Sequence, residues 1–285
     1  MRLKLYFQLM RLHKPIGILL LLWPTLWALW IAAHGFPSLK NLIIFVLGVI
    51  LMRSAGCVIN DFADRTVDLH VARTKLRPLT SGKISAHEAI ILFVILCAIA
   101  FALVLLTNVL TILLSVFAVI TAFIYPFMKR YTHWPQLILG IAFSFSIPMA
   151  FAAETNHVPL IAWILMCANI LWTIAYDTQY AMVDREDDLK IGVKSTAILF
   201  GRYDRWMIGL FQGAFILLMC VIGFLENFSV VYFAGVFFAV LLFIYQHILI
   251  AKRVPEKCFH AFLNNQWGGM VIFIGVLLNY FYTCL

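Results

Sequence analysis

Charged residues are scarce in this chain of 285 residues, at 12%, whereas soluble globular domains carry about 25%. Hydrophobic residues make up 64%, too many for a water-soluble protein to bury. Linkers rich in Gly, Ser or Pro are absent, as are low-complexity stretches, which argues against several domains joined by flexible segments. These absences leave an integral membrane protein, and we expect one domain over residues 1–285.

Motifs of paired cysteine or histidine are also absent. The six cysteines include no CxxC pair, and the eight histidines form no HExxH arrangement, so we expect neither a disulfide nor a zinc or thiolate centre. No small-residue cleavage site follows the first apolar run, which argues against a cleaved signal peptide. The net charge of +8 needs no nucleic-acid partner, because basic loops bind anionic lipid headgroups. No feature indicates an obligate protein partner.

Apolar runs of about 20 residues dominate what is present, and each is long enough to cross a bilayer as a helix. The sequence therefore predicts an all-α, polytopic membrane protein with nine transmembrane helices. The predicted spans are 16–33, 40–60, 88–107, 109–127, 135–153, 158–176, 206–225, 229–250 and 266–284.

Basic residues give this topology an orientation. When the gaps between spans are numbered alternately, 19 of the 21 Lys and Arg residues fall on one side. The exceptions are Lys40 and Arg53. Because basic loops remain in the cytoplasm, we expect a cytoplasmic N-terminus and, with nine spans, a C-terminus outside. This corresponds to the inner membrane of a bacterium.

Two acidic clusters follow predicted spans on that same cytoplasmic side, in the runs NDFADRTVD and YDTQYAMVDREDD. On a helix, residues spaced i, i+4 and i+8, or i, i+7 and i+11, share one face. Each cluster therefore forms a stripe. The first stripe contains Asn60, Asp64 and Asp68, and the second contains Asp177, Asp184 and Asp188. A basic loop follows each cluster, and this internal echo predicts two helical bundles around one central cavity capped by cytoplasmic loops. Off the stripes, we expect Asp61, Glu186 and Asp187 to be solvated.

Opposed carboxylates repel one another unless cations lie between them. Ligands that are all oxygen suit Mg²⁺, which often shares its coordination shell with substrate phosphates. Basic residues near the clusters could bind the other oxygens of a diphosphate. They are Arg73, Lys75, Arg77, Lys129, Arg130 and Lys194. The pattern predicts Mg²⁺-assisted handling of a diphosphate at the membrane surface. Arg53 lies about two turns deeper than Asn60 on the same face, where a guanidinium is costly unless it pairs or binds an anionic substrate group.

The acidic motifs, the loop RTKLRPLTSG from Arg73 to Gly82 and the nine predicted spans resemble the intramembrane aromatic prenyltransferase family over essentially the whole chain. The closest resemblance is to members that act on 4-hydroxybenzoate in ubiquinone biosynthesis. It implies Mg²⁺-dependent transfer of a polyprenyl group from polyprenyl diphosphate to the ring carbon ortho to the hydroxyl of 4-hydroxybenzoate, with release of diphosphate.

The resemblance also implies roles for individual residues. The metal ligands would be Asn60, Asp64, Asp68, Asp184 and Asp188. Among the basic residues, Arg73, Arg77, Lys129 and Arg130 would contact the diphosphate or cap the site. Arg53 would bind the benzoate carboxylate, and Asp177 and Lys194 would belong to the substrate site with less defined roles. The catalytic set is therefore Asp64, Asp68, Asp184, Asp188 and Arg130.

Other interpretations remain open at this point. A relative within the family could use homogentisate, a naphthoate or haem as the acceptor, although Arg53 favours a carboxylate. A CDP-alcohol phosphotransferase is disfavoured, since Asp64-Arg65-Thr66 does not supply the DGxxAR core of that class. A cation-coupled transporter would place its acids near the bilayer midplane, whereas these acids follow the spans.

Overall fold

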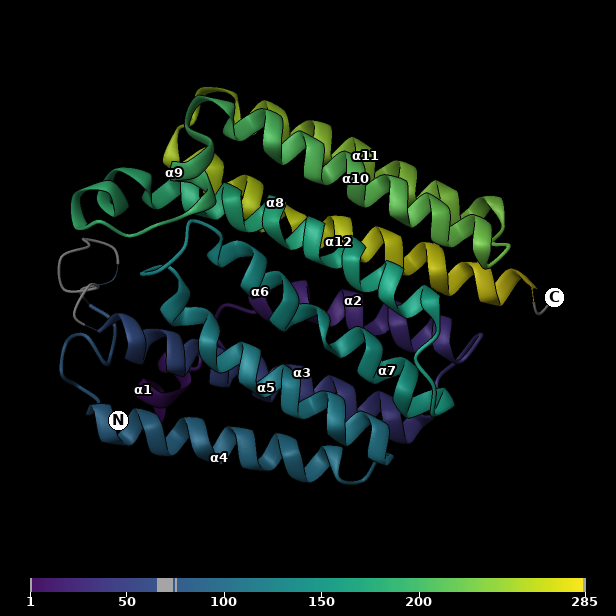
Figure 1. The fold of residues 1–285 in the computed structure, drawn as a ribbon, viewed down its shortest axis with the longest axis horizontal. Coiled ribbons are helices and arrows are strands. Elements are labelled where there is room, and N and C mark those ends of the chain that lie inside the picture. The colour runs from purple at the N-terminus through teal and green to yellow at the C-terminus, as the bar shows by residue number, and fades with distance from the viewer. Residues whose placement is uncertain (1, 66–73, 75, 284–285) are drawn as a thin grey trace.

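The computed structural model describes residues 2–65, 74 and 76–283, and every regular element in this part of the chain is a helix. Figure 1 shows the long helices running side by side, with the N-terminus and the C-terminus at opposite ends of the bundle. The α-helices are α1 (Arg2–Leu9), α2 (Ile16–Ala32), α3 (Leu39–Asp64), α4 (Ala86–Val104), α5 (Val109–Met128), α6 (Pro135–Ser144), α7 (Ser146–Thr155), α8 (Leu160–Ile191), α9 (Thr196–Phe200), α10 (Asp204–Leu225), α11 (Val230–Leu249) and α12 (Pro255–Thr283). Short 3₁₀ turns, Gly201–Tyr203 and Ile250–Lys252, precede α10 and follow α11.

The all-α, multi-pass architecture predicted from the sequence is confirmed. Within the described residues, eight helical segments are long and apolar enough to cross a membrane, and α2, with 17 residues, is apolar but shorter. Length therefore supports eight of the nine predicted spans, and the ninth depends on α2. Large apolar side chains on the outer faces of α4, α5, α10 and α11 are exposed, as expected for surfaces that contact lipid.

Several helix ends follow from local chemistry. In the sequence, Ser85 followed three residues later by Glu88 predicts a capping box. The structure forms it at the start of α4, where the Ser85 hydroxyl accepts from the Glu88 amide and the Glu88 carboxylate accepts from the Ser85 amide. The predicted span 135–153 consists of two helices, α6 and α7, separated at Phe145. Pro148 provides the physical reason, because it lacks the amide proton that would bond the Ser144 carbonyl.

The acidic clusters lie on helices that continue beyond the predicted spans. Helix α3 runs to Asp64 instead of ending at residue 60, and α8 runs to Ile191 instead of ending at residue 176. The long loop expected after the sixth span is therefore mostly helix. Likewise, α12 begins at Pro255, 11 residues before the predicted start at 266. In Figure 1 the ends of α3 and α8 lie at the same end of the bundle as α1 and α9.

Aromatic packing holds the central helices together. Trp27 of α2 and Trp172 of α8 are completely buried and lie 5.5 Å apart between ring centroids, and Phe215 of α10 stacks on Trp172 at 5.6 Å. Buried side chains of α11 and α12 extend this core. The apolar face of α8 is thus packed into this core. Its acidic stripe lies outside the core.

Candidate active site

A cavity of about 1030 Å³ opens between α2, α3, α5, α6 and α8. Nine of the predicted site residues line it: Arg53, Asn60, Asp64, Arg77, Lys129, Asp177, Asp184, Asp188 and Lys194. Residues from segments far apart in the sequence thus meet at one cavity, as the sequence predicted. Two other predicted site residues, Asp68 and Arg73, fall outside the described residues, as does Lys75.

Arg130 is placed differently from the other predicted site residues. Its side chain is exposed and is not part of the cavity lining. Its guanidinium donates to the carbonyl oxygen of Ala63 at 2.5 Å, near the C-terminal end of α3. A cation at that end is favoured by the helix dipole, so in this structure Arg130 caps α3.

Two aspartates of the first acidic cluster, Asp61 and Asp64, are buried and neutralised by neighbouring cations. Asp64 is only 4% exposed and forms an ion pair with the ammonium of Lys129, which begins the loop after α5. A buried carboxylate without a cation would be costly, so Lys129 stabilises Asp64 in this position. Asn60 lies one turn earlier on the same face, as its spacing predicts, and it also lines the cavity.

Asp61 corrects the expectation of a solvated side chain, because it is 2% exposed. Its Oδ1 accepts from Arg11 at 2.6 Å and from Arg77 at 3.0 Å. Both arginines line the cavity. Asp61 therefore joins the N-terminal segment, the end of α3 and the following loop at the charged end of the cavity, which is its mouth.

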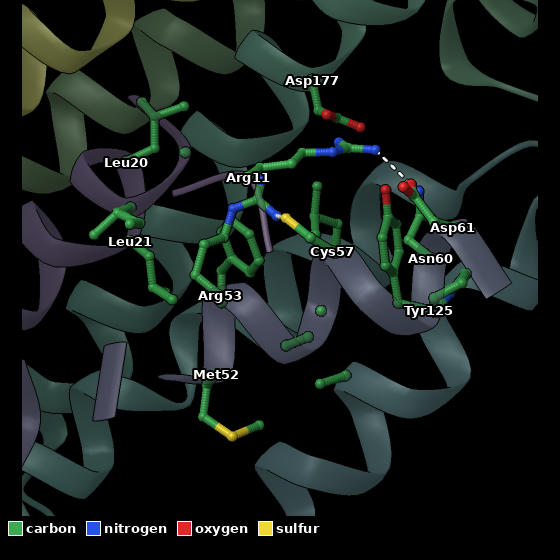
Figure 2. Close-up of a pocket in the computed structure, with 18 of the residues that line it drawn as sticks. Arg11, Leu20, Leu21, Met52, Arg53, Cys57, Asn60, Asp61, Tyr125 and Asp177 are labelled. Carbon is green, nitrogen blue, oxygen red and sulfur yellow. Dashed lines mark hydrogen bonds and ion pairs between the residues drawn. The ribbon is translucent and has the colours of Figure 1, made fainter. Parts of the chain in front are cut away.

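Arg11 was not identified from the sequence, although its side chain reaches into the cavity. It lies between α1 and α2 with a left-handed backbone (φ 55°), and Figure 2 shows its guanidinium extending toward Asp61, in the same view as Asp177. Burial tends to lower the pKa of Arg11, but the Asp61 carboxylate raises it above its ordinary value, so the side chain remains protonated. No spacing rule connects residue 11 to the acidic motifs; only the fold does.

The second cluster presents its stripe to the cavity from a single continuous helix. Asp177, Asp184 and Asp188 of α8 all line the cavity, which confirms that their spacing places them on one face. Glu186 is exposed, and Asp187 pairs with Lys190 at 3.3 Å on the outer surface, as expected for residues off the stripe.

A backbone contact brings two of the predicted basic residues together. The amide of Lys194 donates to the carbonyl of Lys129 at 3.0 Å, and the Lys194 ammonium donates to the carbonyl of Tyr131 at 3.2 Å. The segment after α8 is thereby fixed to the end of α5. Both lysines consequently border the same cavity.

Arg53 lies deeper, beneath the charged mouth. Its Nη1 donates to Cys57 Sγ at 2.7 Å, and its guanidinium carbon lies 6.0 Å from the centre of the Phe143 ring. Within the described part of the chain, Arg53 forms no ion pair within 4.0 Å, and its buried Nε has no hydrogen-bond partner. Asp177 of α8 lies within electrostatic range of Arg53, and in Figure 2 the Arg11 side chain lies between the two in this view.

Aromatic and apolar side chains complete the lining. Three tyrosines near the charged mouth line the cavity, Tyr125, Tyr176 and Tyr180. Farther from the mouth the lining is apolar and comes from α3, α4 and α5, including Phe45, Val49, Phe101, Val104 and Val119. The cavity therefore combines a charged end with an apolar extension.

The donor groups can be compared with the needs of a metal ion. No three Asp, Glu, His or Cys side chains in the described ranges come close enough together to form a metal site. The side chains that border the mouth from α3 and α8 nevertheless offer carboxylate and amide oxygens, the ligand type that Mg²⁺ prefers. The donor chemistry fits Mg²⁺, with oxygens from two helices facing one cavity.

Comparisons with known proteins agree on one family. The model of the UbiA prenyltransferase family matches residues 21–283. A 4-hydroxybenzoate octaprenyltransferase of Pseudoalteromonas translucida is 60% identical over 96% of this chain and 94% of its own, and one of Coxiella burnetii is 58% identical over 96% of both. Among solved structures, the apo structure of a UbiA homolog from Aeropyrum pernix K1 superposes with a TM-score of 0.81 at 24% identity, covering 92% of this chain and 97% of that one. A homolog from Archaeoglobus fulgidus bound to GPP and Mg²⁺ gives 0.73 at 20% identity, covering 94% and 99%.

Proposed function

Because the chain belongs to the UbiA prenyltransferase family and is therefore a prenyltransferase, we propose that its acceptor is 4-hydroxybenzoate and its donor a polyprenyl diphosphate. The reaction would join the first carbon of the polyprenyl group to the ring carbon ortho to the hydroxyl and release diphosphate. This step belongs to ubiquinone biosynthesis. The names of relatives about 60% identical support the substrate assignment.

The position of Arg53 carries the proposal. A guanidinium deep in an apolar cavity is costly unless an anion binds to it, and Arg53 forms no ion pair among the described residues. The carboxylate of 4-hydroxybenzoate supplies that anion. With the carboxylate held there, the phenol ring extends toward the charged mouth, and fixing its orientation can contribute several kcal/mol to catalysis.

The mouth would hold the diphosphate and Mg²⁺. Residues on α3 and α8, together with Asp68, would hold the ion: Asn60, Asp64, Asp184 and Asp188. Bound Mg²⁺ supplies positive charge that stabilises the departing diphosphate. A homolog from Archaeoglobus fulgidus has been solved with GPP and Mg²⁺ bound, and this related structure supports a Mg²⁺ ion and a prenyl diphosphate as ligands of this chain.

Side-chain cations would act on the same leaving group. Arg77, Lys129 and Lys194 line the mouth, and Arg130 caps α3 outside the cavity lining. Arg73 lies outside the described residues and joins this set by resemblance alone. As the allylic C–O bond breaks, negative charge grows on the diphosphate, so these cations stabilise the transition state more than the ground state. Lys129 neutralises Asp64 in the structure, and the diphosphate gives it a second anionic partner.

The carbon fragment left after ionisation is an allylic cation. Tyr125, Tyr176 and Tyr180 line the cavity near the mouth, where aromatic faces stabilise positive charge and exclude water. The apolar extension between α3, α4 and α5 would accommodate the polyisoprenoid tail. Asp177 lines the same cavity within electrostatic range of Arg53, where its charge would influence both substrates.

The proposed function also includes a membrane orientation. The basic residues favour an orientation with the N-terminus and the acidic ends of α3 and α8 in the cytoplasm and the C-terminus outside. The bacterial relatives favour the inner membrane of a bacterium. Water-soluble 4-hydroxybenzoate would enter from the cytoplasm, and the lipid donor would enter from the bilayer.

Detergent-purified protein, Mg²⁺, a labelled polyprenyl diphosphate and 4-hydroxybenzoate provide the direct test. We expect a prenylated hydroxybenzoate by mass spectrometry, and none when EDTA removes the metal. Diphosphate release without this product would reject 4-hydroxybenzoate as the acceptor. Product formation undiminished by EDTA would reject the role of Mg²⁺.

A further inference from the structure

Gly17, the second residue of α2, lies against the guanidinium of Arg53. A Cβ atom at residue 17 would be 2.5 Å from Arg53 Nη2, 2.7 Å from Nε and 2.9 Å from Cζ. Atoms cannot approach this closely, so any side chain at residue 17 must displace the guanidinium. Arg53 reaches its observed position only because residue 17 has no side chain.

The guanidinium is confined on its other sides as well. Cys57 Sγ accepts from Nη1 at 2.7 Å, and the Phe143 ring centre lies 6.0 Å from Cζ. Arg53 comes from α3, Gly17 from α2 and Phe143 from α6, so three helices determine the position of one cation. A guanidinium held in one place presents a fixed fork of donors to a planar carboxylate.

The confined position also places the cation near the start of α2. The dipole of a helix makes its N-terminus partly positive, so this end favours an anion over a cation. The buried Nε of Arg53 adds a donor that has no partner among the described residues. An incoming carboxylate would be stabilised by the partly positive start of α2 and could accept a hydrogen bond from Nε. Without an anion, the guanidinium has neither interaction.

We propose that Gly17 determines the specificity of the acceptor site, by leaving the space in which the Arg53 guanidinium binds an aromatic carboxylate. This inference rests on the proposed function and assigns to it a residue outside both acidic motifs. Gly17 acts through Arg53 and is a positioning residue. Its substitution should weaken recognition of the acid while leaving the binding of the prenyl diphosphate unchanged.

The test compares Gly17→Ala with wild type, using 4-hydroxybenzoate and its neutral methyl ester as acceptors. Loss of a hydrogen bond to a charged group corresponds to a change of about 10-fold to 100-fold. We expect kcat/KM for the acid to fall by that factor, with the ester and the KM for prenyl diphosphate changed by less than about 2-fold. An unchanged preference for the acid over the ester would overturn the proposal.

Gly213→Ala is the matched control, because it makes the same change in α10 at an exposed position with no atom within 4 Å. It should leave both acceptors unaffected. A similar loss in this variant would assign the effect to helix propensity and reject the role of Gly17.

An Arg53→Ala background protects the test against misfolding, since the truncated side chain vacates the space that the new methyl group needs. In that background Gly17→Ala should cause no further loss, because coupled residues give non-additive effects. A full additional loss would show that Gly17 does not act through Arg53. Failure of wild type to prenylate 4-hydroxybenzoate would instead reject the proposed function and the acceptor assigned to this site.

Discussion

The acidic ends of α3 and α8 face the same cavity but are built differently. On α3, Asp61 and Asp64 are buried and each is held by cations from other segments. On α8, Asp184 and Asp188 are partly buried and line the cavity. Burial makes a carboxylate costly unless it is paired. The α3 charges therefore fix the structure of the mouth, while the α8 charges remain at the solvent-accessible surface.

The fixed ion pairs near the end of α8 lie away from its acidic stripe. Arg185 pairs with the buried Asp204 at 2.5 Å, and Arg253 pairs with the same carboxylate at 2.8 Å. These contacts attach α8 to α10 and to the segment before α12. Arg185 thus anchors the end of α8 through Asp204, whereas Asp61 and Asp64 of its own acidic cluster anchor the end of α3.

The largest expected effect is on chemistry at α8. Asp184→Ala should lower prenyl transfer by about 10³-fold, because it removes a carboxylate that would hold the Mg²⁺ ion, whose charge stabilises the departing diphosphate. Radiolabelled product formation in detergent measures this. Asp187→Ala, three residues away on the outer surface, is the control and should retain nearly full activity. Similar losses in both variants would contradict the assignment of the stripe.

A smaller but structural effect is expected on α3. Asp61→Asn should lower the free energy of unfolding by about 3 kcal/mol, because Arg11 and Arg77 would lose their shared carboxylate. Thermal unfolding in detergent measures the change, with Glu186→Gln as an exposed acidic control. Unchanged stability would mean that burial of Asp61 does not depend on these pairs.

The next prediction, Arg53→Ala, concerns binding of the acceptor in the cavity between α3 and α8. It should raise the KM for 4-hydroxybenzoate by about 10-fold to 100-fold with little change in the KM for prenyl diphosphate, since it removes a charged hydrogen-bond donor. Arg65→Ala is the control, because Arg65 is exposed and stacks on Phe62. A loss of donor affinity instead would assign Arg53 to the diphosphate.

The smallest effect is expected on the outer surface of α8. Asp187→Asn removes an exposed pair with Lys190 and should change the free energy of unfolding by no more than about 0.5 kcal/mol. The measurement is the same thermal unfolding experiment as for Asp61. A loss as large as that of Asp61→Asn would remove the difference between the two acidic ends.

Patterns within one segment could be predicted from the sequence. Hydropathy gave the all-α multi-pass fold, helical spacing placed Asp184 and Asp188 on one face, and the Ser85 capping box marked the start of α4. Helix ends were less predictable, since hydropathy detects where a segment becomes polar, and a helix can continue through polar residues. Helix α8 remains regular for 15 residues beyond the predicted span.

The sequence predicted that the two acidic stripes share one cavity, but individual contacts between distant segments could not be predicted. Asp61 lies beside the acidic stripe, and by spacing alone it should be solvated, yet Arg11 bonds to it across 50 residues of sequence. Gly17 has no special sequence context, and its importance depends on where α2 passes α3. Tertiary packing determines these contacts, and the local patterns of a single sequence do not indicate it.

The length of α8 has a consequence for how a lipid substrate is handled. At about 1.5 Å per residue its 32 residues extend about 48 Å, whereas the hydrocarbon core of a bilayer is about 30 Å thick. The helix must therefore protrude from the hydrocarbon, and Asp184 and Asp188 of its acidic stripe lie in its last turns. Under the proposed function, a donor with its diphosphate at that height would keep its apolar chain in the apolar extension of the cavity and in the lipid beyond it. Since each methylene moved from lipid to water costs about 0.8 kcal/mol, the enzyme avoids this cost by bringing its charges to the surface where the donor already resides.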